Sequence, residues 1–202
     1  MSNSFAIVPA AGRGRRMGGA KLLLPRGQST VIEQVLSAWQ ASRVTHTIVV
    51  VHPEDDALAQ ICRASGAQVI VPAEPPPEMK VSVRIALEHI ASQHMPGADD
   101  AWLLAPADLP TLSAEVIDCL LTAHPSGQES ILVPVHAGRR GHPALFPWTL
   151  SGEVARLPDD CGVDSLFTRH TVTEIEASAD ALAPDLDTPE DYRREKKGPD
   201  PS

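Results

Sequence analysis

Short, continuous apolar segments alternate along this chain with longer segments of helical periodicity. Clear examples of the apolar segments are Phe5–Val8, Thr47–Val51 and Ala101–Ala105. An unbroken apolar run of this length is typical of a strand buried on both faces, because a half-exposed strand alternates polar and apolar residues. Alternation of such strands with helices predicts a doubly wound, mostly parallel, Rossmann-like sheet in a three-layer α/β/α domain.

The same patterns predict the remaining elements. Further strands are expected at Gln68–Val71, Ser130–Val135, Ala144–Phe146 and Thr171–Ile175. Helices are expected at Thr30–Ser42, Asp55–Ala64, Met79–His94, Ala114–Ala123 and Pro189–Glu195. The length of 202 residues suits one domain, which we place at residues 1–195. The tail, residues 196–202, is rich in charge and proline and is expected to be disordered.

Composition and charge exclude several classes of protein. The net charge of -9 argues against a broad nucleic-acid surface, and no apolar run approaches the ~20 residues of a membrane span. The three cysteines are far apart and form no C-x-x-C pair, which favours a reducing compartment and no zinc site. The first residues carry no signal-peptide pattern, so the expected location is cytoplasmic.

The loop after the first predicted strand concentrates glycines and cations. It contains Gly12, Gly14, Gly18, Gly19, Arg13, Arg15, Arg16 and Lys21. Successive backbone N–H groups in a glycine-rich turn form a concave site for phosphate, while arginine and lysine add positive charge. Because the rest of the chain is acidic, this local pattern predicts a small anionic ligand, most simply a nucleotide.

Two common phosphate-binding motifs fail at this loop by one position. The dinucleotide fingerprint G-x-G-x-x-G fits Gly12 and Gly14, but the third glycine comes one residue late, at Gly18. The NTPase loop G-x-x-x-x-G-K-[ST] fits Gly14 and Gly19, but Ala20 precedes the lysine. A nicotinamide-dependent reductase is disfavoured further, because no acidic residue follows at the required place after the second strand.

Two aspartates stand out near predicted element ends, and the one that follows a buried strand is well placed to hold a divalent cation. Asp108 stands in a proline-bracketed turn after the strand Ala101–Ala105, and Asp187 precedes the helix cap Thr188. Magnesium takes one or two carboxylates together with substrate phosphates. The alternative for Asp108 is a hydrogen bond within its own turn. A helix start explains Thr188, Glu190 and Asp191 but not Asp187, which precedes the cap.

The turn between the predicted strands at 130–135 and 144–146 has the sequence Gly-Arg-Arg-Gly-His-Pro. Arg139 and Arg140, flanked by Gly141 and His142, are suited to an anionic second substrate. A surface hairpin with solvated arginines, and a histidine bonded to a carbonyl group, is the simpler alternative.

These motifs together resemble the MobA/MocA-type nucleotidyltransferase family, most closely its molybdopterin cytidylyltransferase branch. The resemblance rests on Ala10-Ala11-Gly12-x-Gly14-x-Arg16-Met17-Gly18 with Lys21, on Pro106–Pro110, on the Gly138–Pro143 turn and on Asp185–Asp191. It spans Ala6 to Tyr192. It implies the nucleotide-diphospho-sugar transferase type of fold and a magnesium-dependent transfer of a nucleoside monophosphate to a phosphorylated small molecule, with release of pyrophosphate.

The resemblance also implies roles for individual residues. Arg16, Lys21 and Asp108 would be catalytic, and Asp108 and Asp187 would hold Mg²⁺. The nucleotide would contact Ala10, Ala11, Gly12, Gly14, Arg16, Gly18, Lys21 and Ser82. Arg139, Arg140, Gly141 and His142 would bind the acceptor. In this family Ala-Ala-Gly at the loop start goes with cytidine, so CTP is favoured over GTP. The resemblance also implies a transient contact of this protein with a molybdoenzyme or its chaperone.

Some positions depart from the family pattern and leave alternatives open. Lys80, Val81 and Ala86 differ from the family's M-S-S-S-L-R-A-G-L helix start, and Asp164 stands where arginine is common. The changes at the helix start put the identity of the acceptor or of the base in doubt, and the change at Asp164 that of the acceptor, more than they do the fold. The open alternatives are a guanylyl- or cytidylyltransferase for a different phosphorylated small molecule, and a nucleotide-binding relative without catalysis.

Overall fold

The computed structural model describes residues 2–12 and 21–177 and is built on one eight-stranded sheet. Its strands are β1 (Ser4–Ala10), β4 (His46–Val51), β5 (Gln68–Ile70), β6 (Ala101–Leu104), β7 (Ile131–His136), β8 (Arg139–Arg140), β9 (Ala144–Pro147) and β10 (Val172–Glu176). Each of the seven strands predicted from the sequence corresponds to a strand of this sheet. A separate small hairpin consists of β2 (Pro25–Arg26) and β3 (Ser29–Thr30).

The sheet is mixed but mostly parallel, as predicted. Its order is β10-β7-β9-β6-β1-β4-β5, with β8 paired to β7. Strand β1 has parallel neighbours on both sides, β4 and β6, and β4 continues in parallel to β5. Strand β9 runs antiparallel to β6 and β7, because only a short turn separates it from β7 and a parallel pair needs a crossover of about a dozen residues.

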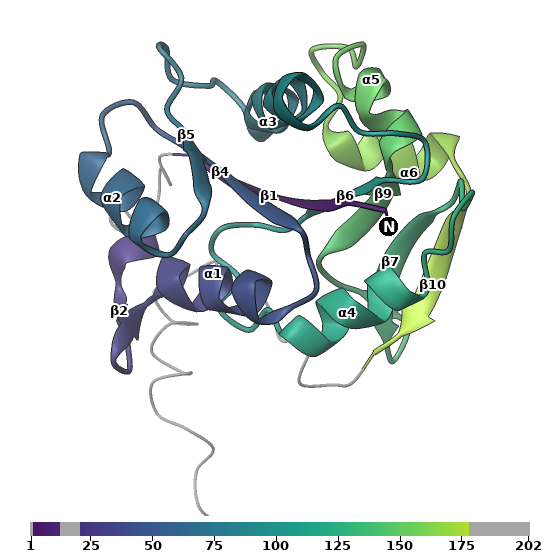
Figure 1. Cartoon of the computed structure of the whole chain (residues 1–202), viewed down its shortest axis with the longest axis horizontal. Helices are drawn as coiled ribbons and strands as arrows, with labels where there is room; N and C mark the ends of the chain where they lie inside the picture. The colour runs from purple at the N-terminus through teal and green to yellow at the C-terminus, as the bar shows by residue number, and fades with distance from the viewer. Residues whose placement is uncertain (1, 13–20, 178–202) are drawn as a thin grey trace, which may run out of the picture.

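Helices cover both faces of the sheet and complete the three layers (Figure 1). One face carries α1 (Val31–Ala41), α2 (Asp56–Ala64) and α4 (Ala114–Thr122). The other carries α3 (Met79–His94), α5 (Ser151–Val154) and α6 (Leu166–Arg169). Short 3₁₀ turns are η1 (Lys21–Leu23), η2 (Trp148–Leu150) and η3 (Val163–Ser165). No helix in the described ranges is long and apolar enough to cross a membrane.

Each face of the sheet has its own apolar core. Beneath α1 and α4, Trp39 and Ile117 pack against alternate residues of the central strands, such as Val49. Beneath α3, Val83 packs against the opposite set, which includes Ile7. Every residue of a central strand therefore faces a helix, which explains why the sequence of these strands is apolar without alternation.

Local signals set the helix boundaries close to those predicted. Thr30 caps α1 and forms a reciprocal pair with Glu33, whose carboxylate accepts the Thr30 N–H at 2.7 Å. These hydrogen bonds lower the pKa of Glu33 below its ordinary value. Asp55 and Ser113 cap α2 and α4 more simply, since each side chain accepts one backbone N–H, from Leu58 and Val116 respectively. The predicted helix Pro189–Glu195 and the tail lie outside the described residues.

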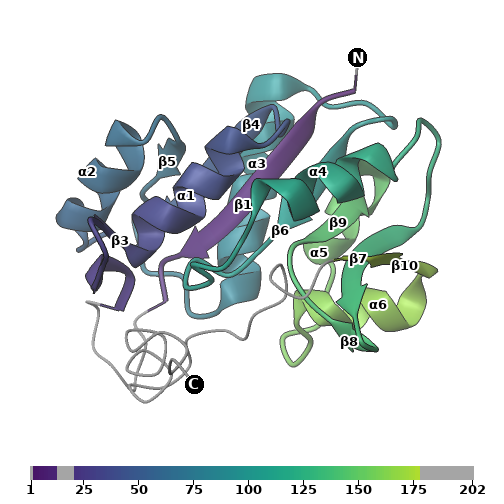
Figure 2. The same cartoon turned by 90° about the horizontal axis from the view of Figure 1, so that it is seen from below.

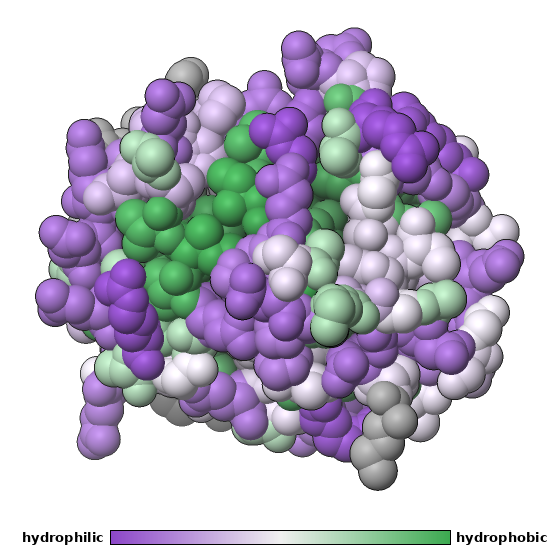
Figure 3. Space-filling model, turned by 45° about the horizontal axis from the view of Figure 1, so that its top comes forward, coloured by the Kyte–Doolittle hydropathy of each residue, from purple (hydrophilic) through white to green (hydrophobic). Residues whose placement is uncertain are grey.

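Few large hydrophobic side chains are exposed in the part of the chain that the structure describes. Among the described residues, the large hydrophobic side chains that are exposed are Val71, Met79 and Met95. Val71 and Met79 stand at the two ends of the segment that leads from β5 into α3. Figure 3 shows a hydrophobic area bordered by hydrophilic side chains on the face that includes the top of Figure 1.

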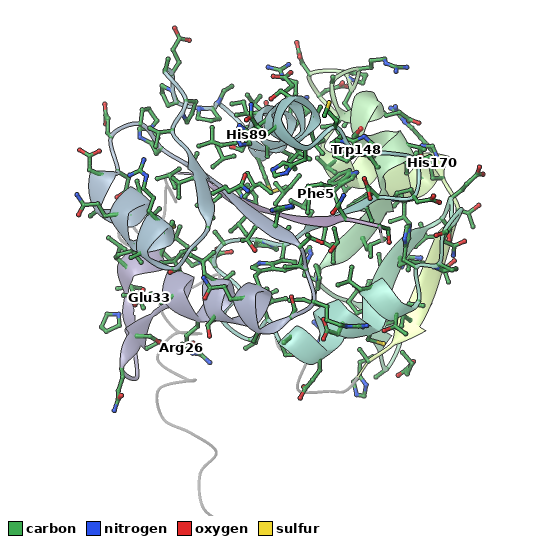
Figure 4. All side chains as sticks on the ribbon, in the orientation of Figure 1. Phe5, Arg26, Glu33, His89, Trp148 and His170 are labelled. Carbon is green, nitrogen blue, oxygen red and sulfur yellow. The ribbon has the colours of Figure 1, made fainter. Side chains whose placement is uncertain are left out.

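Aromatic and histidine rings close the amino-terminal edge of the sheet. Phe5 stacks on His46 at 5.4 Å between ring centroids and lies 5.9 Å from Trp148 (Figure 4). The ring centroids of His46 and His94 lie 4.2 Å apart, and the side-chain amide of Gln68 forms a hydrogen bond with each ring. Burial, and secondarily the charge of His46, lowers the pKa of His94 below its ordinary value.

The turn that joins β7 to β8 uses two residues with positive φ. Ala137 has φ 48° and Gly138 has φ 74°. Two such residues in a two-residue loop match the right-handed twist of a β-hairpin. Glycine adopts this conformation freely, but a residue with a Cβ is strained in it.

We predict that the fold is less stable in mild acid because of His94. Since its folded-state pKa lies below the unfolded value, the contribution is fully present above the unfolded pKa and is lost as pH falls through the folded pKa. Urea unfolding between about pH 5 and 8 should therefore show stability that decreases with acid, and the decrease should be smaller in His94→Asn. An identical pH dependence in the two proteins would contradict this assignment.

We also predict that Ala137→Gly stabilises the protein. The substitution relieves a left-handed conformation in an exposed turn, so the free energy of unfolding should rise by about 0.5–1 kcal/mol. Gly138→Ala, the matched change at the neighbouring position, should lower it by a similar amount. Urea denaturation of both variants measures the difference, and the account of this turn is wrong if the two shifts have the same sign.

Candidate functional site

The carboxyl ends of β1 and β6 meet at the centre of the sheet, where the strand order reverses. Strand β4, the next strand of this sheet along the chain, pairs with one side of β1, and β6, which comes later in the chain, pairs with the other side. In open α/β sheets such a switch point is the usual ligand site, because the loops that follow the two strands leave a crevice between them. The first loop holds the predicted phosphate cradle, and the second holds Asp108.

Lys21 and Asp108 contact each other across this crevice. The Lys21 ammonium donates to Asp108 Oδ2 at 2.6 Å, and the two side chains are 17% and 29% exposed. A charge-assisted bond of this length is among the stronger polar contacts in proteins. Sequence reasoning placed both residues in one site, and the structure brings their side chains together.

The turn that carries Asp108 is anchored by its neighbours. Ala107 and Leu109, on either side, are each 5% exposed and belong to the apolar core beneath α1 and α4. Because both neighbours point into the core, the carboxylate between them is held at the surface of the crevice. Lys21 begins η1, whose Leu22 and Leu23 pack against the same core.

The described part of the nucleotide loop lies at the end of β1. Ala10 ends the strand and is 5% exposed, and Ala11 is 3% exposed and packs in the core beneath α3. Gly12 is exposed, and a Cβ added to it would meet no atom within 4 Å. The open space beside Gly12 is therefore available to a ligand. Gly14, Arg16 and Gly18 lie outside the described residues.

Ser82 lies in the first turn of α3 and is 3% exposed. Helix α3 connects two parallel strands, β5 and β6, so its amino end lies at the carboxyl edge of the sheet. The cap residue Glu78 makes no side-chain hydrogen bond to the helix. Ser82 therefore lies at the correct edge for a nucleotide contact, with its side chain in the protein interior.

The predicted acceptor loop forms the β7–β8 hairpin and the chain that follows it. Arg139 and Arg140 are exposed, and Arg140 Nε donates to Glu174 Oε1 on β10 at 2.8 Å. The Gly141 N–H donates to the Pro134 carbonyl at 2.9 Å, and the bond from His142 to Pro143 is cis. Arg140 thus has a carboxylate partner already, and an anion must compete with Glu174 for it.

The carboxylate at this edge suits a cation that is held mainly by phosphates and water. Between residues 2–12 and 21–177, no group of three His, Cys, Asp or Glu side chains is arranged to hold a metal ion. Asp108 supplies one hard oxygen ligand, which is the type and number that Mg²⁺ takes beside a nucleotide. Asp187, the second predicted ligand, lies outside the described residues.

Sequence reasoning missed two contacts at this edge. Glu174 gave no signal because it lies in an ordinary strand and meets Arg140 only through the pairing of β10 with β7. Lys80 was noted only as a departure from a motif, yet its side chain is almost fully buried.

A cavity of about 220 Å³ lined by Trp39, Thr45 and Gln68 lies at the opposite, amino-terminal edge.

Comparison with known proteins identifies the family of this chain. The sequence profile of the MobA-like NTP transferase domain matches residues 6–174. The molybdenum cofactor cytidylyltransferase of Escherichia coli (strain K12) is 26% identical over 196 residues, which is 95% of each chain.

Solved structures agree with the fold. The crystal structure of Rv0371c from Mycobacterium tuberculosis H37Rv superposes with a TM-score of 0.83 at 30% identity, covering 98% of this chain and 100% of that one. The same protein is known in complex with manganese. A 4-diphosphocytidyl-2C-methyl-D-erythritol synthase, 19% identical, has a TM-score of 0.74 over 98% of this chain and 99% of its own, and indicates a shared fold alone.

We predict that Gly12→Ala leaves the fold intact and weakens nucleotide binding. The added methyl group meets no protein atom, so the free energy of unfolding should change by less than about 0.5 kcal/mol. The same methyl group would enter the space proposed for the phosphates, and affinity for a nucleoside triphosphate should fall at least tenfold, on the order of 1.4 kcal/mol.

Gly97→Ala is the matched control for this prediction. Gly97 also has no atom within 4 Å of an added Cβ, and it lies in the loop before β6, at the amino-terminal edge. Titration calorimetry with a nucleoside triphosphate should give wild-type affinity for this variant. Equal affinities for the Gly12 and Gly97 variants would remove Gly12 from the site.

Proposed function

Because this chain belongs to the MobA-like NTP transferase family, and is a nucleotidyltransferase of that type, we propose that it transfers CMP from CTP to the phosphate of molybdopterin. The observation that supports the proposal most is the contact of Lys21 with Asp108 at 2.6 Å. It joins the loop of the nucleotide motif to the carboxylate of the P-A-D-x-P turn, at the position where sheets of this type bind ligands.

In the proposed reaction, a phosphate oxygen of the acceptor attacks the α-phosphorus of CTP. One P–O bond forms to the acceptor, the bond between the α-phosphorus and the bridging oxygen breaks, and pyrophosphate leaves. The attacking group is already an anion, so no general base is required. Catalysis then consists of orienting the two phosphates and neutralising the charge that accumulates on them.

The residues of this chain divide that work. Gly12, with Gly14 and Gly18, would let the backbone approach the triphosphate. Lys21 would leave Asp108 and turn toward the phosphates, as its flexible stem permits. Arg16 would neutralise the departing pyrophosphate. Asp108, with Asp187, would hold Mg²⁺, which supplies further positive charge to the phosphates when it is bound.

The second substrate would approach from the β9–β7 side of the site. Arg139 is the exposed cation of the hairpin for which no carboxylate partner is described, so we assign it the first contact with the acceptor phosphate. Arg140 would exchange Glu174 for the acceptor, and Gly141 and His142 would shape the turn. Release of the product to a molybdoenzyme or its chaperone, in the cytoplasm, would be the last step of the proposed reaction.

Two alternatives share the same site. The acceptor could be another phosphorylated small molecule, because Lys80 and Asp164 differ from the family pattern at the acceptor side. The base could be guanine, since Ala11 packs in the apolar core and its effect on base choice is indirect. A binding protein without catalysis would retain the cradle but have no need for both Lys21 and Asp108.

We predict that Asp108→Asn and Lys21→Met each lower the rate of pyrophosphate release by about 10²–10³-fold, the usual loss when one charge-stabilising group is removed. The wild type should release pyrophosphate from CTP and Mg²⁺ only when molybdopterin is present. Lys21→Met should also weaken CTP binding, whereas Asp108→Asn should affect binding mainly through the metal.

Glu33→Gln serves as a control for the loss of a charged group, because Glu33 pairs with the cap residue Thr30 at the start of α1 and has no proposed role in the site. It should keep the wild-type rate. Turnover with GTP but not CTP would reject the cytidine assignment. Nucleotide binding without pyrophosphate release, with molybdopterin or any other phosphorylated acceptor tried, would favour the binding protein.

A further inference from the structure

Lys80 is a buried cation that binds main-chain oxygens. The residue is 9% exposed, and its ammonium donates to the carbonyl oxygens of Pro158 at 2.7 Å and Asp159 at 3.0 Å. Glu78 Oε2 lies 3.8 Å away. An ammonium group is costly to bury unless it is hydrogen-bonded, and here two carbonyl groups of one loop provide the bonds.

The loop that Lys80 holds is a tight turn between two anchored residues. The Cys161 N–H donates to the Pro158 carbonyl at 3.0 Å, which closes the turn over Asp159 and Asp160. Leu157 before the turn and Val163 after it are buried in the core beneath α3. The turn itself is largely exposed, so Lys80 is the side chain that fastens it to the rest of the domain.

Lys80 places this turn at the functional edge of the sheet. It lies in the first turn of α3, whose amino end is at the carboxyl edge. The chain enters this region from the end of β9 and leaves it into β10, both at the opposite edge. Figure 2 shows the loop between α5 and α6 reaching the edge toward which the β1 arrow points.

The turn lies on the side of the site that the nucleotide cradle leaves free. The cradle follows β1, whereas Phe167 in α6, the helix that follows the turn, stacks on Phe146 of β9 with 5.8 Å between ring centroids. The β7–β8 hairpin follows β7 on the same side of β6. The turn and the hairpin therefore border the space in which the second substrate must meet the α-phosphate.

A lysine at this helix position carries an electrostatic cost. The amino end of a helix has a partial positive charge, which disfavours a cation in the first turn. Glu78 makes no cap hydrogen bond to α3, and its carboxylate, 3.8 Å from the ammonium and largely exposed, offsets only part of this cost. The hydrogen bonds to the Pro158 and Asp159 carbonyl groups compensate for this electrostatic cost. The position of Lys80 therefore supports a role in holding the turn.

We propose that Lys80 is a positioning residue that fixes the turn at residues 158–161 as a wall of the acceptor site. This inference rests on the proposed nucleotidyl transfer, and it adds that acceptor binding depends on a side chain that touches neither substrate. Loss of the ammonium frees the turn and weakens binding of the acceptor. Binding of the nucleotide changes much less, because the β1 loop carries most of its proposed contacts.

Cys161 reports the state of the turn independently of activity. In a Cys119→Ser background the remaining thiols are Cys161, which is partly exposed, and Cys62, which is buried and whose pKa burial raises to about 12. Labelling by a small maleimide therefore measures access to Cys161. Lys80→Met should increase the labelling rate at least threefold, and the control Arg169→Met, an exposed cation on α6, should not change it.

The kinetic test uses CTP, Mg²⁺ and molybdopterin. Lys80→Met should raise KM for molybdopterin about tenfold, consistent with losing hydrogen bonds from a charged donor, and should leave KM for CTP within about twofold. Lys80→Gln, which keeps a donor, should lie between Lys80→Met and the wild type in both measurements. It also provides the test if Lys80→Met does not fold.

The labelling and kinetic results test separate parts of the proposal. Unchanged labelling of Cys161 overturns the role of Lys80 in holding the turn, whatever the activity. Faster labelling with an unchanged KM for molybdopterin shows that the turn is held but does not position the acceptor, which also overturns the proposal. Equal increases in both KM values would indicate general damage to the site. A wild type that releases no pyrophosphate refutes the proposed function, while the labelling result stands on its own.

Discussion

The contact between Lys21 and Asp108 is the interaction on which the candidate site depends. It joins residues 87 positions apart in the sequence, and it does so because β1 and β6 are parallel neighbours whose loops leave the sheet at the same edge. The two charges are only partly exposed, so each would be costly to leave without a partner. A triphosphate and its metal would replace these partners with equivalent ones.

The sheet makes this arrangement rigid while the surrounding edge stays polar. The central strands are covered by helices on both faces and are anchored by two apolar cores. Two of the segments at the carboxyl edge depend also on polar side-chain contacts, those of Arg140 with Glu174 and of Lys80 with Pro158 and Asp159. A substrate can compete for contacts of this kind without disturbing the core.

The sequence predicted the fold closely because the buried strands and capped helices are local patterns. The helix at Met79–His94 begins and ends where expected, and all seven predicted strands are present. The β2–β3 hairpin and the helices α5 and α6 were missed, because two- to four-residue elements are too short to show a period. The antiparallel direction of β9 was not predicted either, since strand direction depends on the length of the connection.

The site was predictable only where residue type alone carries the chemistry. Lys21 and Asp108 stood out because a lysine after glycines and an aspartate after a buried strand suit phosphate and metal. The pairing of Arg140 with Glu174 depends on the register between β7 and β10, and the contacts of Lys80 depend on a long-range loop. Neither has a signature in a single sequence. The roles of Lys21 and Asp108 remain predictions, as do those of Arg16, Gly14, Gly18 and Asp187, which lie outside the described residues.

The most direct test of the central claim is a crystal structure with CTP and Mn²⁺, in which anomalous scattering locates the metal. We expect the metal to be bound by an Asp108 oxygen and by CTP phosphate oxygens, at roughly 2.0–2.3 Å. The Lys21 ammonium should have moved from Asp108 to a phosphate. A structure with CTP bound, the metal away from Asp108 and the Lys21–Asp108 contact intact would contradict the account.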